Sequence, residues 1–338
     1  MNSSTKTSQP RPTLLRRFGG DRAGVIGGII LVIMFVACFA TLPFTLAWVN
    51  VEGVDDRRYE AGNLELNLMP PSMDFSSEDT LRVEAARESG SYVPHTAMGT
   101  DKLGRGFMVR VLLGGAVSLG IGFAAAIIAV TIGTFYGATS GYLGGRTDAV
   151  LMRVVDVLYG LPYILLVVLI SVAADGVISR AGLDPSSASR QIVNVSTLLV
   201  AIGGVGWLTT ARVVRGQVLS LREQPFIEAC RALGVSPRRQ FLRHLLPNLV
   251  GPIVVYGTLA VPAAILSESF LSFLGIGVAE PLPSWGNLAS EGLIELNTVK
   301  SRWWLLAGPC VFIAVTLVSL NLLGDSLKAR FDPVHSTS

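Results

Sequence analysis

The stretch VLLGGAVSLGIGFAAAIIAVTIGTFYGATSGYLGG, residues 111–145, contains no charged side chain. A helix needs roughly 20 apolar residues to cross the hydrocarbon core of a bilayer, so this stretch is long enough to span a membrane with residues to spare. Its glycine-rich end, which includes Gly137 and Gly141, is typical of a loop. We therefore predict a membrane-spanning helix over 113–138, followed by a turn.

Similar uncharged runs recur along the rest of the chain. Half of the 338 residues are hydrophobic and only 15% are charged, a balance expected for a protein that is solvated by lipid. The run that begins at Ala23 is longer than the roughly 7 to 15 residues of a signal-peptide core, so we interpret it as an uncleaved anchor. The expected fold is all-α, a polytopic membrane protein with six transmembrane helices at 23–48, 113–138, 154–174, 196–215, 249–274 and 304–323.

The distribution of lysine and arginine predicts the orientation of these spans. An even number of spans puts both ends of the chain on one side, and basic residues are concentrated before the first span and between Arg212 and Arg243. By the positive-inside rule, both ends are expected in the cytoplasm of a bacterium, with the chain passing several times through its inner membrane. The expected divisions are a cytoplasmic segment 1–22, the first helix 23–48, an outer loop 49–112, a core 113–323 with five spans, and a cytoplasmic tail 324–338.

The outer loop is too long for a simple connection and is rich in acidic residues. Its composition predicts a short surface helix at 78–90. The loop either meets a solute-binding protein or is a solvated insertion, and the sequence leaves both interpretations open.

Several function classes lack support in the sequence. There is no G-x-x-x-x-G-K-[ST] phosphate-binding motif, so the chain is not expected to hydrolyse ATP by itself. Cysteines and histidines are scattered without the spacing of a zinc site, and no serine has the context of a catalytic nucleophile. We expect no enzymatic activity, no metal and no cofactor. The net charge of +3 reflects basic inner loops and does not indicate nucleic-acid binding.

The most informative segment is the loop 212–249, which lies between the fourth and fifth predicted spans. A helix is predicted from Gln224 to Leu233, and Gly234 suits the left-handed residue that ends it. Ser236 suits the N-cap and Pro237 the first position of a second short helix. The pattern predicts two helices with a sharp corner. Such an elbow either lies on anionic lipid or presents small residues to another protein.

Within this loop, Glu228-Ala229-Cys230, followed by Gly234 and by Leu246-Pro247, resembles the EAA signature of permeases from ATP-binding-cassette importers. Cys230 replaces the usual alanine, and because cysteine is nearly as small, docking should survive. In that family the segment carries a coupling helix that docks on a separate ATPase subunit. The resemblance implies that Glu228, Ala229, Cys230 and Gly234 contact the ATPase.

Other blocks narrow the resemblance to the dipeptide, oligopeptide and nickel permease group. GTDKLGRG at 99–106 resembles its GTD-x-x-GRD element, with Gly106 in place of the usual aspartate. Further similar blocks are GYLGG at 141–145, Asp156 with Leu161-Pro162, LSLRE at 219–223, LSFLGIG at 271–277, PSWG at 283–286 and NLLGD at 321–325. Arg16-Arg17-Phe18 resembles the "C-type" subunit of such systems.

This resemblance implies a type I permease fold with defined partners. They are a second, B-type permease, two ATP-binding-cassette ATPase subunits, an extracytoplasmic solute-binding protein and the lipid bilayer. The solute would be a peptide or a similar small molecule, nickel included. A self-contained secondary transporter or channel is the alternative, and it would show an inverted repeat and broken helices at the bilayer midplane.

A few polar residues near the spans have two possible roles. Glu268 and Asp156 either line the translocation path or a subunit interface, or are ordinary interfacial charges. Asp101 and Arg105 are expected to pair on an interfacial helix. The block 283–286 is expected to form a tight turn with Trp285 as an interfacial anchor, or to take part in gating or partner contact.

Overall fold

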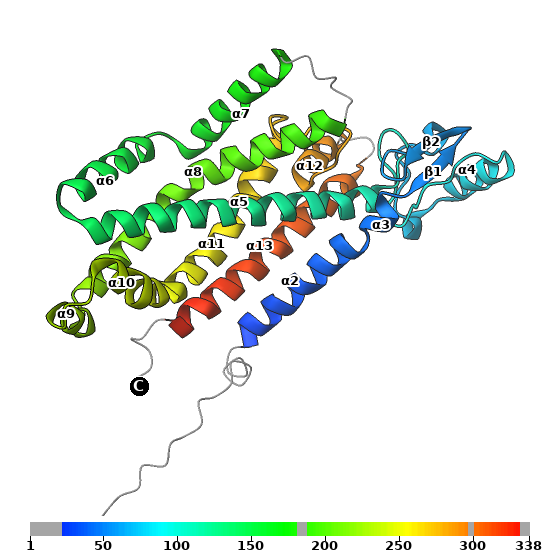
Figure 1. Cartoon of the computed structure of the whole chain (residues 1–338). Helices are drawn as coiled ribbons and strands as arrows, with labels where there is room; N and C mark the ends of the chain where they lie inside the picture. The colour runs from blue at the N-terminus through cyan, green and yellow to red at the C-terminus, as the bar shows by residue number, and fades with distance from the viewer. Residues whose placement is uncertain (1–21, 181–187, 297–300, 332–338) are drawn as a thin grey trace, which may run out of the picture.

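The computed structural model describes residues 22–180, 188–296 and 301–331, which are mostly helical. Figure 1 shows a bundle of long helices that run side by side. They are α2 (Arg22–Ala40), α5 (Phe107–Leu143), α8 (Ala188–Arg222), α11 (Leu246–Phe273) and α13 (Trp303–Phe331). Among the described residues, five helices are long and apolar enough to cross a membrane, and there are six spans if one bent pair of helices is counted as a single span. The predicted all-α, polytopic architecture is confirmed.

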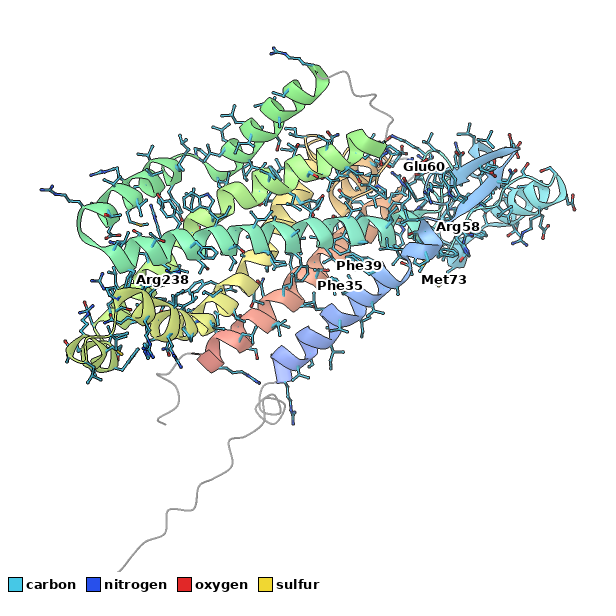
Figure 2. All side chains as sticks on the ribbon, viewed as in Figure 1. Phe35, Phe39, Arg58, Glu60, Met73 and Arg238 are labelled. Atoms are coloured by element: carbon cyan, nitrogen blue, oxygen red, sulfur yellow. The ribbon has the colours of Figure 1, made fainter. Side chains whose placement is uncertain are left out.

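The two ends of the bundle carry different structures. One end, here called the elbow end, holds α9 (Pro225–Ala232) and α10 (Pro237–Gln240), with a π-helical turn Phe241–Leu245 that leads into α11. The opposite end, called the hairpin end, holds the β-strands and α4 (Figure 1). Figure 2 places Arg238 at the elbow end, and Arg58 and Met73 at the hairpin end. The first turn of α2 and the last of α13 both lie at the elbow end (Figure 1), as an even number of spans requires.

Much of the bundle's outer surface is apolar. Val32 on α2 is 61% exposed and Phe135 on α5 is 69% exposed, which would be unfavourable in water over so large an area. Lipid hydrocarbon is the solvent that suits this surface. Phe35 and Phe39 of α2 stack with ring centroids 4.1 Å apart, and Phe35 meets Phe123 of α5 edge-on at 6.0 Å (Figure 2).

The second span is longer than its composition predicts, and the predicted end at 138 is wrong. α5 continues to Leu143 because its glycines serve close helix packing instead of a loop. Gly133, Gly137 and Gly141 recur every four residues and face α8, and a Cβ at Gly137 would lie 2.2 Å from the carbonyl oxygen of Ala211. Small residues at this spacing let two membrane helices approach backbone to backbone.

A straight third span at 154–174 is also wrong. The structure has α6 (Gly145–Tyr159) and α7 (Tyr163–Arg180), which meet at an angle of 85°. Pro162 has no N–H for a helical hydrogen bond and its ring restricts Leu161, so the helix breaks there. Figure 1 shows the resulting corner beside α8.

The hairpin end is a small folded domain, residues 46–106, called the outer domain below after the outer loop that the sequence predicts. After α3 (Leu42–Thr45), β1 (Trp48–Val51) pairs antiparallel with β2 (Val54–Arg57) through a turn at Glu52-Gly53, both with positive φ. That turn type matches the twist of a hairpin. Single 3₁₀ turns follow at Leu64–Leu66 and Ser72–Asp74.

The predicted surface helix is confirmed as α4 (Ser77–Glu88), which begins with a capping box between Ser76 and Asp79. α4 buries Val83 and Ala86 against Leu66 and Met69, so the outer domain has an apolar core of its own. The hairpin was not predicted.

Near the hairpin end, α12 (Trp285–Ile294) packs into the bundle instead of lying at its surface. The Trp285 side chain has no exposed area, and its indole N–H donates to the carbonyl oxygen of Val111 at 3.0 Å. An interfacial anchoring role for Trp285 is therefore wrong, because the indole belongs to the core between α5, α12 and α13. The predicted turn is the capping box of α12, formed by Ser284 and Asn287.

The last helix also differs from the prediction. α13 continues to Phe331, so the tail predicted to begin at 324 is helical through that residue. The predicted N-terminal segment, except for its last residue, and the end of the tail, 332–338, lie outside the described residues.

Candidate functional site

The elbow forms as its backbone signals predict. α9 begins with Pro225 at its first position and buries Ile227 against the bundle. At its end, Gly234 has φ +69°, its N–H donates to the carbonyl of Arg231, and the Val235 N–H donates to the carbonyl of Cys230, both at 3.0 Å. These two bonds make a Schellman motif, which satisfies the last carbonyl groups of the helix. The corner therefore has one defined geometry.

The outward side of α9 is small and partly apolar. Glu228, Ala229 and Gly234 are exposed, Cys230 is half-buried, and Leu233 is 82% exposed. We call the exposed residues Phe226, Glu228, Ala229, Leu233 and Gly234 the elbow face. The structure thus brings all four residues predicted to contact the ATPase to one short helix and its cap. An exposed leucine and phenylalanine beside small residues are typical of a surface that another protein covers.

Two contacts tie the elbow to α5, and a third joins α8 to α5 close to where the elbow begins. The Tyr142 hydroxyl at the end of α5 donates to the carbonyl of Pro237 at 2.6 Å, and its ring lies 5.1 Å from that of Phe241. Arg222, at the end of α8, donates to the carbonyl of Gly141 on α5 at 2.7 Å. The elbow is thus connected to α5 through Tyr142, and by chain continuity to α8 before it and to α11 after it.

A cavity of about 570 Å³ lies between α5, the α6–α7 corner, α8 and α11. Its lining is mostly apolar and includes Ala125, Ala129, Tyr159, Tyr163, Leu208 and Tyr256. The break at Pro162 contributes directly to its wall. Non-helical backbone at membrane depth is tolerated where it lines a cavity. The position of the helix break beside the cavity agrees with this rule.

Asp156 lies beside the rim of this cavity that is nearer the elbow end. Its carboxylate accepts a hydrogen bond from Arg212 of α8 at 2.7 Å, and the two side chains are 57% and 39% exposed. The Arg212 guanidinium also lies 4.0 Å from the centre of the Tyr159 ring, which lines the cavity. One turn away on α8, Arg215 pairs with Asp148 at 2.5 Å, and Ser140 also donates to that carboxylate.

Glu268 is placed differently from Asp156. Its side chain has no exposed area, and it accepts hydrogen bonds from Ser272 at 2.8 Å and Ser269 at 3.3 Å. Ser118 and Ser284 complete a ring of serines around the carboxyl group. The carboxyl group is thus enclosed within its own chain, and a role on the translocation path or at a subunit interface stays a prediction.

The structure also shows a charged cluster that the sequence indicated only in part. Asp101 and Arg105 pair at 2.6 Å as predicted, but in a turn before α5 and not on an interfacial helix. The same Asp101 accepts from Arg110 at 2.7 Å, and Arg110 donates twice to Glu291 of α12, at 2.8 and 3.2 Å. Glu291 comes from a region 181 residues distant in the sequence from Arg110, so spacing could not reveal this partner.

The cluster joins the outer domain to the bundle. Asp101 belongs to the turn at 99–106, Arg110 to α5, and Glu291 to α12, so three segments meet at one set of charges. The turn itself is pinned, since the Thr100 hydroxyl donates to the carbonyl of Leu66 at 2.6 Å and accepts from the Met69 N–H at 2.9 Å.

Comparison with known protein families identifies the family to which this chain belongs. The model of the family described as "Binding-protein-dependent transport system inner membrane component" matches residues 129–334, which include the elbow and most of the cavity wall. The chain belongs to this family. It is therefore a multi-pass membrane permease, and the permease fold implied by the EAA resemblance is confirmed.

Curated relatives agree over longer stretches of this permease. The oligopeptide transport system permease protein OppC of Haemophilus influenzae is 43% identical over 235 residues, which are 70% of this chain and 69% of that protein. The dipeptide transport system permease protein DppC of Bacillus subtilis is 42% identical over 235 residues, 70% and 68% of the two chains. The Escherichia coli OppC is 40% identical over 318 residues, 94% of this permease and 89% of its relative. The permease is thus a membrane subunit of an ATP-binding-cassette importer.

Proposed function

We propose that this permease is the C-type subunit of a peptide importer in a bacterial inner membrane, with the elbow end in the cytoplasm. Its expected partners are a B-type permease, two ATPase subunits and an extracytoplasmic solute-binding protein. The permease itself carries out no chemistry, and ATP is hydrolysed by the ATPase partners. Support for the solute class comes from the relatives, which are named for oligopeptide and dipeptide transport.

The exposed elbow face is the observation that carries this proposal. α9 lies at the end of the bundle beyond the long helices, where basic residues such as Arg238 indicate the cytoplasm (Figures 1 and 2). Its surface is small enough at Ala229 for close approach and apolar enough at Leu233 to be buried by a partner.

The geometry supports a mechanism of coupled movement. When the ATPases close, α9 is displaced, and the contacts of Tyr142 and Arg222 pass the displacement to α5 and α8. These helices and α11 line the cavity, so its access changes as the bundle moves. ATP binding thereby shifts the population between inward-facing and outward-facing states, because the ATPase dimer binds the two states with different affinity.

The main rival is a self-contained secondary transporter or channel. The broken span at α6–α7 is a feature that such a carrier would also have. A carrier of that kind has no need of an ordered, exposed docking helix outside the bundle, and its family would not be defined by dependence on a binding protein.

The test is co-purification of the tagged permease from its own cells in mild detergent, with mass spectrometry of the bound proteins. The informative variant is Ala229→Arg, because alanine and arginine both favour helix, so the change adds bulk and a positive charge to the elbow face without weakening the helix. The matched control is Ala149→Arg, which makes the same change at an exposed position of α6 at the elbow end.

We expect a second permease and ATPase subunits with the wild-type chain and with Ala149→Arg. Ala229→Arg should retain the second permease and lose the ATPases. A wild-type chain that purifies alone, or an Ala229→Arg variant that retains its ATPases, would contradict the proposed coupling.

A further inference from the structure

We propose that Asp156 and Arg212 form an exchangeable charge pair at the cytoplasmic rim of the cavity, and that each exchanges its partner for a charged group of a passing peptide. Arg212 would receive carboxylate groups and Asp156 ammonium groups. This inference rests on the proposed peptide importer and names the residues at which the permease distinguishes one peptide from another.

The position of the pair relative to the cavity is the first observation. Asp156 lies one turn before Tyr159 on α6, and Arg212 lies one turn after Leu208 and Thr209 on α8, all three of which line the cavity. The guanidinium of Arg212 lies over the Tyr159 ring at 4.0 Å. A solute that leaves the cavity towards the elbow end therefore passes this pair.

The exposure of the pair is the second observation. With 57% and 39% of their side chains exposed, the two charges keep much of their hydration, and an exposed pair contributes little net stability. Replacing one partner by a charged group of the solute therefore costs little. A single contact at 2.7 Å joins Asp156 and Arg212, which leaves other donor and acceptor positions of both groups free for the solute.

The neighbouring ion pair between α8 and α6 is more buried and makes more hydrogen bonds. Arg215 and Asp148 form two hydrogen bonds of 2.5 Å, Asp148 also accepts from Ser140, and its side chain is only 14% exposed. Those contacts, which include a bond to α5, already hold α6 against α8. The Asp156–Arg212 pair is the more exposed of two ion pairs between α6 and α8, and so the one that a solute can reach.

The chemistry of the site fits a short peptide. The cavity volume of about 570 Å³ lies within the roughly 300–1,000 Å³ of small-molecule sites, and its alanine and tyrosine lining suits uncharged backbone and apolar side chains. A peptide combines such a body with at least one carboxylate and one ammonium group. An apolar cavity with one acid and one base at its rim is complementary to that combination.

The experiment measures uptake by the complete transporter in proteoliposomes, with its binding protein at saturating concentration. Two tripeptides are compared, Ala-Glu-Ala and Ala-Lys-Ala, and the ratio of their uptake rates is recorded for each variant. The variants are Arg212→Gln, Asp156→Asn and the exchange Asp156→Arg with Arg212→Asp. Ratios relative to wild type remove any preference of the binding protein, which is the same throughout.

Arg212→Gln should shift the ratio about two- to fivefold towards the lysine peptide, and Asp156→Asn by a similar factor towards the glutamate peptide. The exchanged pair should transport both peptides, because it keeps one charge of each sign at the rim. Equal loss of both peptides in the single variants, with unchanged ratios, would refute the proposal and leave the pair a structural contact. A wild-type transporter that takes up neither peptide would instead overturn the proposed function, and this inference with it.

Discussion

Removal of Arg110 should loosen the turn at 99–106 that joins the outer domain to the bundle. The Arg110 side chain has no exposed area and neutralises two acids at once, Asp101 at 2.7 Å and Glu291 at 2.8 Å. With Arg105, the cluster holds two positive and two negative charges and is neutral as a whole. In Arg110→Met, the remaining charges leave a net negative charge in a site from which water is largely excluded.

The cost of that change follows from the burial of the cluster. Breaking a buried ion pair by removing one partner costs about 3–5 kcal/mol, because the other partner remains buried without its counter-charge. The backbone amides of Leu103 and Arg105 report this cost locally, since both donate to the carboxylate of Asp101 at 2.9 Å. Their exchange with solvent deuterium should accelerate by about two to four orders of magnitude.

Hydrogen exchange with mass spectrometry, on the permease in lipid nanodiscs, measures this effect on the peptide that contains residues 99–106. Adding Glu291→Gln to Arg110→Met restores neutrality and should recover most of the protection. Arg87→Met, at an exposed position of α4, is the matched control and should leave exchange unchanged. If Arg110→Met exchanges within about threefold of wild type, or if the second substitution recovers nothing, the electrostatic account is refuted.

Two glycine pairs test the packing. Gly137→Leu places a side chain against a carbonyl of α8 and should lower the midpoint of thermal unfolding strongly, whereas Gly120→Leu, with no atom within 4 Å of its Cβ position, should not. Equal midpoints would rule out close packing of α8 on Gly133, Gly137 and Gly141, here called the glycine seam. Gly99→Ala and Gly90→Ala both strain a positive φ, at a cost of about 1 kcal/mol, but only the first also clashes, 2.4 Å from the carbonyl of Met69. Limited proteolysis should therefore release the outer domain faster from the first variant alone, and similar rates would count against the clash.

The elbow could be predicted from sequence because its rules are local. Three residue types set the corner: the glycine that ends the first helix, the N-cap residue of the second helix and the proline at the first position of the second helix. Each acts through the backbone of its immediate neighbours. Gly234 and Pro237 occupy the predicted positions, and Ser236 precedes α10, although its hydroxyl does not cap that helix. The predicted spans were found for a similar reason, since length and apolarity alone decide whether a helix can cross lipid.

The predictions from sequence were wrong where one local pattern is compatible with two different structures. A glycine-rich segment ends a helix when its backbone turns, and continues a helix when another helix packs on it, as α8 does at Gly141. Only the position of the second helix decides between them. Pro162 did give a usable signal, because a proline two residues after Gly160 inside an apolar run predicts a break. Trp285 looked interfacial because its partner, the carbonyl of Val111, is distant in sequence.

The structure shows what the residues of the block 99–106, which resembles a family motif, do in the fold. The block is a turn in which Gly99 and Gly104 have positive φ, and Gly104 lies against the backbone of Asn63. Asp101 organises the turn and receives the two arginines. Gly106, which replaces an aspartate of the motif, is the N-cap residue of α5. An aspartate there would supply a capping oxygen, which glycine cannot, so the departure removes a cap and leaves the charged cluster intact.

The helix α5 connects the hairpin end of the permease to the elbow end. Its 37 residues at about 1.5 Å each reach from one end of the bundle to the other. Arg110 near its start is held by the charged cluster, and Tyr142 near its end bonds to the elbow. Between them, the glycine seam fixes α5 to α8 without flexible side chains in the interface. Because a helix packed backbone to backbone cannot slide or bend easily, we expect a displacement of the elbow to move α5 and α8, which both line the cavity, as one unit. The glycines of α5 that made its end hard to predict from sequence are thus the residues that pack it closely on α8, and this packing suits α5 to pass on a movement of the elbow.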